Sequence, residues 1–271
     1  MQSVNNENAK SALHEKEGFH VWWRLLRPHT LTASFIPVIV GTMLAALDQS
    51  FHFLLFLAML IASLLIQAAT NMFNEYYDYA RGLDTKESIG IGGTIVRDGV
   101  APKTVRNLAY GFIIVAMLLG VYICIASNWW IMVVGLICIL HGYLYSGGPY
   151  PISYTPFGEL ASGFFMGTVI IGISYFIQTG QLTVELIVIS IPVAILIGTI
   201  NLSNNIRDRE GDKENGRKTI PILLGHSNAV KLLGLLLLVS NLITLVLIVV
   251  GILLIWALIT LLSLKKVRQA Y

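Results

Sequence analysis

Two clusters of amide and carboxylate side chains recur along the chain with the same spacing. Both follow the pattern N-x-x-N-(E/N)-x-x-D, and an α-helix places these positions on one face. An acid at Asp212 extends the second cluster by one further turn. The first cluster is Asn71, Asn74, Glu75 and Asp78, and the second is Asn201, Asn204, Asn205 and Asp208.

The ligand type predicts the chemistry of these clusters. Oxygen ligands without a nearby histidine or cysteine suit Mg²⁺, which proteins usually hold through one or two carboxylates together with substrate phosphates. Two stripes that face one cavity therefore predict a metal-bridged diphosphate. Cationic side chains beside the clusters are candidates for binding the remaining phosphate oxygens. They are Arg81, Arg207, Lys213, Arg217 and Lys218.

A single stripe of this kind has two explanations of about equal merit. Its residues either cap a helix and form solvated loop charges, or they form a functional site. Each stripe, however, sits where an apolar segment meets a polar one, and amides and carboxylates are costly in hydrocarbon. Side chains of this kind are expected to face the interior of a helix bundle or a wet cavity. Two matching stripes at the same kind of boundary therefore favour a functional site.

The elements that carry the stripes are predicted to be transmembrane helices. The 271 residues are 55% hydrophobic and only 12% charged, with a mean hydropathy of +0.73, which argues against a soluble domain. About 20 apolar residues span a bilayer, so we expect an all-α bundle of about eight spans in one integral-membrane domain (1–271) with two pseudo-repeated halves. The predicted spans are 30–47, 52–73, 108–126, 129–146, 158–178, 185–203, and two short spans within 232–264 that divide near Val250 and Gly251.

The distribution of charge supports this span count. If the polar tail 1–20 is cytoplasmic, all 18 lysines and arginines fall on that side, together with both stripes. The opposite connections (48–51, 127–128 and 179–184) carry none, as the positive-inside rule requires. The tail lacks the apolar core of a signal peptide. We therefore expect a multi-pass protein of the cell (plasma) membrane with cytoplasmic site loops.

Composition also argues against two other classes of function. A net charge of +3, from basic residues scattered among apolar runs, does not predict nucleic-acid binding. Cys124 and Cys138 both lie in apolar runs, so neither a disulfide framework nor a cysteine metal cluster is expected.

The motifs and their surroundings resemble the UbiA superfamily of intramembrane aromatic prenyltransferases, and in detail its 1,4-dihydroxy-2-naphthoate polyprenyltransferase branch. The resemblance extends to about residue 230. It is carried by RLLRPHTLTASFIPVIVGT (24–42), QAATNMFNEYYDYARGLDT (67–85), IGGTIVRDG (91–99), YSGGPYPISYTPFGE (145–159) and NNIRDREGDKENGRKT (204–219).

The resemblance implies roles for individual residues. It implies that Asn74, Glu75, Asp78 and Asp84 bind Mg²⁺ and diphosphate, as do Asn204, Asp208 and Asp212. Arg81, Arg207, Lys213 and Lys218 would contact phosphate, and Asn71 of the first stripe is also expected to bind the diphosphate. The expected catalytic acids are Asp78, Asp208 and Asp212. Family members usually have nine transmembrane helices, so the last family helix is expected to be shortened or missing in this chain.

The implied reaction is transfer of a polyprenyl group to 1,4-dihydroxy-2-naphthoate with loss of CO₂, which gives demethylmenaquinol in menaquinone synthesis. A related enzyme acting on another aromatic acceptor, such as 4-hydroxybenzoate, remains an alternative. The alternative from a different class is a transporter, because repeated polar stripes in a bundle can form a substrate pathway. Transporter sites lie near the membrane midplane, whereas these acids lie at predicted helix ends, which favours the enzyme.

Overall fold

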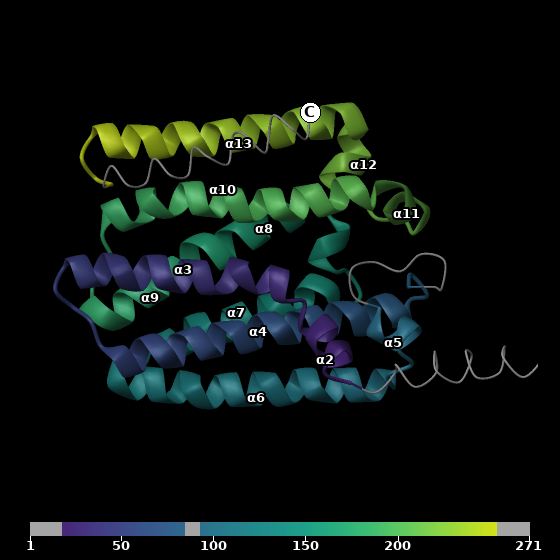
Figure 1. The fold of residues 1–271 in the computed structure, drawn as a ribbon, viewed down its shortest axis with the longest axis horizontal. Coiled ribbons are helices and arrows are strands. Elements are labelled where there is room, and N and C mark those ends of the chain that lie inside the picture. The colour runs from purple at the N-terminus through teal and green to yellow at the C-terminus, as the bar shows by residue number, and fades with distance from the viewer. Residues whose placement is uncertain (1–17, 85–92, 254–271) are drawn as a thin grey trace, which may run out of the picture.

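The computed structural model describes residues 18–84 and 93–253, and the regular structure in these ranges is entirely helical (Figure 1). Long helices lie side by side and form a bundle. The elements are α2 (Phe19–Leu26), α3 (Pro28–Leu47), α4 (Phe53–Ala80), α5 (Thr94–Arg97), α6 (Pro102–Ala126), α7 (Ile131–Ser146), η1 (Ile152–Tyr154), α8 (Gly158–Ser162), η2 (Gly163–Val169), α9 (Ile170–Thr179), α10 (Val184–Arg207), α11 (Arg209–Glu214), α12 (Ile220–Leu224) and α13 (His226–Val249).

The expected all-α membrane bundle is confirmed. Within the described ranges, 6 helical stretches are long and apolar enough to cross a membrane, and the 16-residue α7 is a shorter apolar helix. Together they match the first seven predicted spans, because α8, the π-helical η2 and α9 join into one stretch, Gly158–Thr179. Helix α13 ends at Val249 beside the predicted division, where Gly251 adopts a φ of 81°. The predicted eighth span lies outside the described residues.

Several helices extend beyond the predicted spans on the side of the polar clusters. Helix α4 continues to Ala80, α6 begins at Pro102 and α13 begins at His226. A hydropathy window detects only the apolar part of a helix, so it ends where polar residues begin even if the helix continues. Pro102 explains the start of α6, because proline is favoured in the first turn of a helix.

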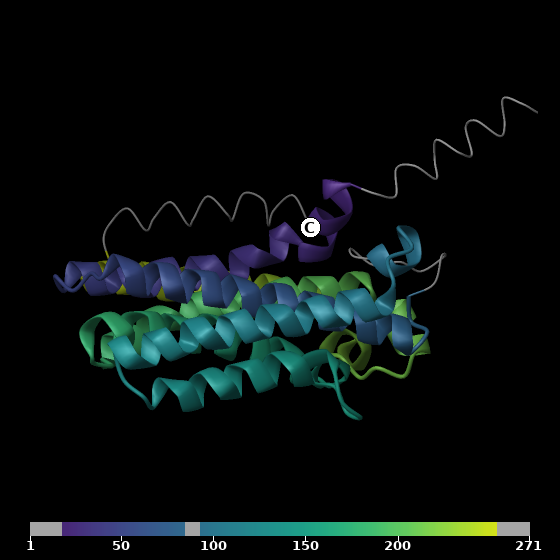
Figure 2. The ribbon, with the colours of Figure 1, turned by 90° about the horizontal axis from the view of Figure 1, so that it is seen from below.

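One end of the bundle, called here the motif end, carries the short helices α2, α5, α11 and α12 (Figures 1 and 2). Both polar stripes reach this end, on α4 and α10, and the lysines and arginines of the described residues lie there or in the adjoining turns. The turns at the opposite end, between α3 and α4, α6 and α7, and α9 and α10, contain no lysine or arginine. This arrangement agrees with the predicted one-sided distribution of basic residues.

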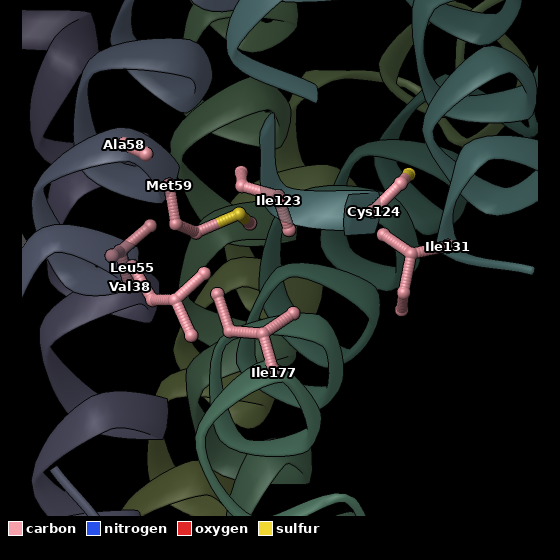
Figure 3. Close-up of a cluster of buried hydrophobic side chains, with 8 residues drawn as sticks. All are labelled: Val38, Leu55, Ala58, Met59, Ile123, Cys124, Ile131 and Ile177. Atoms are coloured by element: carbon pink, nitrogen blue, oxygen red, sulfur yellow. The ribbon is translucent and has the colours of Figure 1, made fainter. Parts of the chain in front are cut away.

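The half of the bundle far from the motif end is packed with aliphatic side chains (Figure 3). Val38 of α3, Met59 of α4 and Ile123 of α6 belong to this buried cluster, with Ile131 of α7 and Ile177 of α9. Five helices, α4 among them, therefore meet in this cluster, and their packing holds α4, which carries the first stripe.

The π-helical segment packs against α10 through glycines. A Cβ atom on Gly167 would lie 2.5 Å from the Ala194 Cα, and one on Gly163 would lie 2.5 Å from the Ala194 carbonyl oxygen. These obstacles are backbone atoms, which cannot turn aside as a flexible side chain can. Small residues that let two backbones approach are typical of membrane helix contacts.

Gly167→Ala is therefore expected to lower the melting temperature in detergent. The added methyl group overpacks the contact, and overpacking typically costs about 1–3 kcal/mol. Gly172→Ala is the matched control in the same span, because its Cβ would meet nothing nearer than a Leu182 side-chain atom at 3.9 Å. Equal melting temperatures for the two variants would show that the contact tolerates a larger residue.

Candidate functional site

The two stripes meet at one cavity of about 650 Å³. Near the motif end its wall is polar and charged, and farther into the bundle it is aliphatic. The polar part includes Arg27, Asn74, Asp78, Asp84, Asn204, Asn205, Arg207, Asp208 and Arg217. The aliphatic part includes Met59, Ile123, Ile131, Met132, Ile170 and Ile173.

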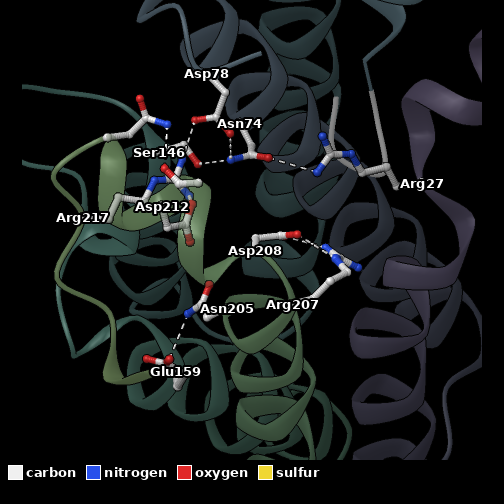
Figure 4. Close-up of polar contacts among 12 residues, drawn as sticks. Arg27, Asn74, Asp78, Ser146, Glu159, Asn205, Arg207, Asp208, Asp212 and Arg217 are labelled. Atoms are coloured by element: carbon white, nitrogen blue, oxygen red, sulfur yellow. Dashed lines mark hydrogen bonds and ion pairs between the residues drawn. The ribbon is translucent and has the colours of Figure 1, made fainter. Parts of the chain in front are cut away.

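Asn74 holds the carboxylate of Asp78 in position. Its amide nitrogen donates to the Asp78 Oδ2 at 3.0 Å and lies 3.3 Å from the Ser146 Oγ, while its amide oxygen accepts from the Arg27 Nη1 at 3.0 Å. One amide therefore fixes a carboxylate of α4 against α7 and orders a cation that precedes α3 (Figure 4).

Asn71 lines the cavity and also ties α4 to the chain around it. Its amide nitrogen donates to the Leu26 carbonyl at 3.1 Å and to the Thr30 hydroxyl at 2.8 Å. Both partners lie where α2 turns into α3, so Asn71 fixes the segment that carries Arg27.

Glu75 does not lie where a metal ligand was expected. Its carboxylate is buried and accepts hydrogen bonds from the Thr94 hydroxyl and, at 3.0 Å, from the Ile95 backbone N–H on α5. The Arg27 Nη2 lies 3.8 Å from its other oxygen. Glu75 does not line the cavity formed by the described residues; it connects α5 to α4 and helps to hold Arg27.

The helix that carries the second stripe ends just before Asp208, the acid of that stripe. Helix α10 ends at Arg207 and α11 begins at Arg209, which leaves Asp208 at the junction. The Asp212 backbone N–H still donates to the Asp208 carbonyl at 2.9 Å, so Asp212 follows one turn later, as predicted. Arg207 forms hydrogen bonds of 2.7 and 2.6 Å to the two Asp208 carboxylate oxygens at the cavity wall.

Arg217 joins the two stripes (Figure 4). Its guanidinium lies 2.9 Å from the Asp78 Oδ1 and 3.0 Å from the Asp212 Oδ1. The Tyr154 ring packs against the same guanidinium, 4.7 Å from ring centre to Cζ. The predicted convergence of the two stripes is thus present as one ion-paired group.

The other cations expected to bind phosphate lie elsewhere. The Arg81 guanidinium donates to the backbone carbonyls of Ser146 at 2.7 Å and Gly148 at 3.0 Å, so it supports the turn after α7. Lys213 and Lys218 are exposed beside the site. None of the three lines the cavity within the described residues. Arg27, which the sequence analysis missed as a site residue, does line it.

Burial makes two of the acids weak enough to exchange protons in mildly acidic solution. It raises the pKa of Asp84 to about 6, and the nearby Asp78 charge acts in the same direction. Burial also raises the pKa of Asp212 to about 6, although the adjacent Arg217 partly opposes the increase. A cation that binds here therefore competes with protons near that pH.

The residues fit a metal that arrives with a phosphate ligand. No three acidic, histidine or cysteine side chains in the described part of the chain converge closely enough to hold a metal by themselves. The charged wall nevertheless offers the carboxylates of Asp78, Asp84 and Asp208 as oxygen ligands. Asp212 does not line the cavity within the described residues, but it contacts Arg217, which does, and its buried Oδ2 has no hydrogen-bond partner among the described residues. Carboxylate oxygens completed by phosphate oxygens are the usual environment of Mg²⁺.

Fold and site together define an all-helical membrane protein with a cavity whose wall at the motif end carries both arginines and carboxylates. The chain belongs to the UbiA prenyltransferase family, whose model matches residues 34–267. It is 52% identical to the 1,4-dihydroxy-2-naphthoate octaprenyltransferase of Bacillus subtilis (strain 168), over 100% of this chain and 87% of that protein. The enzyme of the same name from Mycobacterium tuberculosis is 32% identical, over 84% of this chain and 78% of its own.

A solved structure supports the fold independently. The UbiA homologue from Archaeoglobus fulgidus bound to GPP and Mg²⁺ superimposes with a TM-score of 0.70, although only 17% of residues are identical. The match covers 92% of this chain and 86% of that one. At this identity the likeness establishes the shared helical architecture.

Proposed function

We propose that this protein transfers a polyprenyl group from an allylic diphosphate to 1,4-dihydroxy-2-naphthoate with loss of CO₂, giving demethylmenaquinol for menaquinone synthesis. The observation that carries the proposal is a cavity with Asp78 and Asp208, one acid from each stripe, and Arg217 at one end and an aliphatic wall at the other. Such a cavity suits a ligand with an anionic head and a long apolar chain. The 52% identity to the Bacillus subtilis enzyme supports the choice of acceptor.

In this proposal the acids of the motif end hold Mg²⁺ and the arginines of the cavity wall hold phosphate. Asp78, Asp84, Asp208 and Asp212 are the carboxylates, while Asn74 orients Asp78. Arg27, Arg207 and Arg217 face the diphosphate. When bound, Mg²⁺ would stabilise the charge that develops on the departing diphosphate.

The remaining predicted residues take supporting roles. Glu75 and Arg81 hold the surrounding segments in place through the contacts described above. Lys213 and Lys218, exposed beside the cavity, raise the local positive potential that attracts an anionic ligand. The aliphatic wall accommodates the isoprenoid chain and keeps water away from the reactive allylic carbon.

The acceptor is tested by comparing specificity constants for two aromatic acids. Purified protein with Mg²⁺ and octaprenyl diphosphate should prenylate 1,4-dihydroxy-2-naphthoate with a higher kcat/KM than 4-hydroxybenzoate. The product should lack the naphthoate carboxylate. A higher kcat/KM for 4-hydroxybenzoate, or a product that retains the carboxylate, would overturn the choice of acceptor.

The requirement for Mg²⁺ should depend on pH. Asp84 and Asp212, with pKa values of about 6, are ionised above that pH and protonated below it. Because Mg²⁺ binds the ionised form, its apparent KM should rise roughly tenfold as the pH falls from about 7.5 to about 5.5. Asp84→Asn should show a shallower dependence, whereas a Mg²⁺ KM that does not change with pH would contradict these ligands.

We expect the protein to lie in the plasma membrane, with both stripes facing the cytoplasm. Cysteines introduced singly at Asn215 and Gln181, in a background with Cys124 and Cys138 replaced by alanine, test this. An impermeant thiol reagent added to intact cells should label Gln181→Cys and spare Asn215→Cys. The reverse pattern would invert the proposed orientation.

A further inference from the structure

One part of the cavity wall carries aromatic rings and has no role in the site described above, although it shares Asn205 with the charged part. We call it the ring wall, and it lies deeper in the bundle than the acids. Ser146, the partner of Asn74, lies near the end of α7, and Tyr145 directly precedes it. His141 lies five residues before Ser146, or about 7.5 Å along the helix. The ring wall consists of His141, Tyr145, Ser162, Phe165, Asn201 and Asn205.

The ring wall is suited to a flat ligand. The His141 and Phe165 rings are stacked, with centroids 4.0 Å apart and an interplanar angle of 18°. Phe165 belongs to the π-helical segment η2, and π-helical insertions often occur at functional sites. The aliphatic part of the cavity wall, farther into the bundle, suits a flexible isoprenoid chain better. The ring wall therefore suits a different ligand.

The ring wall also has unused hydrogen-bonding capacity. The His141 Nε2 is buried and has no hydrogen-bond partner among the described residues. Buried polar atoms are nearly always paired, so a bound molecule is the natural partner. The Asn201 amide nitrogen contacts the Tyr145 hydroxyl at 3.0 Å and also the Ser162 hydroxyl, which leaves the Asn201 amide oxygen as a further acceptor.

Asn205 adds an oriented amide at the border with the acids. Its nitrogen donates to the Glu159 Oε1 at 2.9 Å. Figure 4 shows its oxygen pointing away from Glu159, toward the acidic group. Because Asn205 precedes Asp208 by three residues, the two lie about one helical turn apart.

We propose that the ring wall binds the aromatic acceptor as a hydroxylated ring, with one ring hydroxyl hydrogen-bonded to the His141 Nε2. A hydroxyl group both donates and accepts, so it pairs with a neutral imidazole in either tautomer. A ring held here lies one to two helical turns from the acids. It is therefore placed beside the allylic carbon of a chain whose diphosphate those acids hold. This inference rests on the proposed function and adds the acceptor subsite to it.

His141→Phe tests the hydrogen bond, because it keeps an aromatic ring beside Phe165 and removes the nitrogen. We expect the KM for 1,4-dihydroxy-2-naphthoate to rise about tenfold, a usual effect of losing one hydrogen bond. The KM for octaprenyl diphosphate should not change. His226→Phe, at the exposed start of α13, is the matched control and should behave like the wild type.

Inhibition by monohydroxy analogues identifies the ligand group that His141 contacts. Against the wild type, 1-hydroxy-2-naphthoate and 4-hydroxy-2-naphthoate should have different inhibition constants, because only one of them keeps the hydroxyl that reaches His141. In His141→Phe this difference should disappear. If His141→Phe does not fold, Phe165→Leu takes its place, with the exposed Phe164→Leu as control, and should raise the acceptor KM alone.

The outcomes separate the two proposals. A wild-type protein that prenylates no aromatic acceptor would overturn the proposed function. An active wild type together with a folded His141→Phe variant whose acceptor KM is unchanged would overturn the ring wall alone. An equal rise in both substrate KM values would also overturn it, because the residue would then shape the cavity generally.

Discussion

Asp208→Asn should lower turnover at least about 100-fold at saturating Mg²⁺ and prenyl diphosphate, and Asp78→Asn should do the same. Each replacement keeps the size of the side chain and removes the charge that would hold the cation against the departing diphosphate. Groups that stabilise developing charge in this way typically contribute several kcal/mol to a rate. The measurement is steady-state product formation by purified variants.

The control for this pair is Glu214→Gln, an exposed acid at the end of α11 that does not line the cavity within the described ranges. Its turnover should stay within about twofold of the wild type, as exposed charges away from a site usually contribute little. If Asp208→Asn retained near-normal turnover at matched protein levels, the second stripe would have no part in the reaction.

Arg217→Met should cause the largest loss of stability among the site variants when Mg²⁺ is absent. The side chains of Asp78, Asp212 and Arg217 are only 15%, 11% and 13% exposed, so the two carboxylates would be left buried without their cation. Removing one partner from a buried ion pair typically costs about 3–5 kcal/mol. The melting temperature of the purified protein in detergent and EDTA measures this loss.

Mg²⁺ should restore part of the stability of Arg217→Met, because a divalent cation can supply the missing positive charge between the acids. The gain in melting temperature on adding Mg²⁺ should therefore be larger for this variant than for the wild type. Lys213→Met removes an exposed cation from the same region and should change neither value. A melting temperature for Arg217→Met equal to that of the wild type in EDTA would show that the bridge does not stabilise the fold.

The membrane bundle and the meeting of the two stripes follow from features that a sequence displays directly. A span of about 20 apolar residues is a local signal. Helical spacing then places Asn74 and Asp78 on one face. A contact between residues that are far apart in the sequence has no such local signal. Arg217 reaches Asp78 only because the turn after α11, where Gly216 has a φ of 75°, brings it back over the cavity.

The position of Glu75 shows the limit of helical periodicity. Successive residues of a helix are about 100° apart, so Asn74 and Glu75 stand at opposite edges of the stripe that contains both. When Asn74 faces the cavity, Glu75 faces the packed helix α5. Asn205 occupies the equivalent edge of the second stripe and likewise turns its nitrogen aside, to Glu159. The spacing predicts a polar face but not which edge of it meets the ligand.

Arg27 was missed for a different reason. It is the residue between α2 and α3, with a φ of 50°, and its side chain reaches α4. No periodic pattern marks a single residue at such a junction. The surrounding sequence RLLRPHT belongs to a stretch that resembles the family, and the contacts of Arg27 to Asn74 and Glu75 give this stretch a physical role.

Binding of an unreactive substrate analogue tests the central claim most directly, because it does not depend on the acceptor. The measurement is the affinity of the wild type and of the Asp78→Asn, Asp208→Asn double variant for a prenyl thiodiphosphate, with Mg²⁺ or with EDTA. We predict tight binding only for the wild type with Mg²⁺. Equal affinity in EDTA, or equal affinity for the double variant in Mg²⁺, would contradict a metal-bridged diphosphate held by the two stripes.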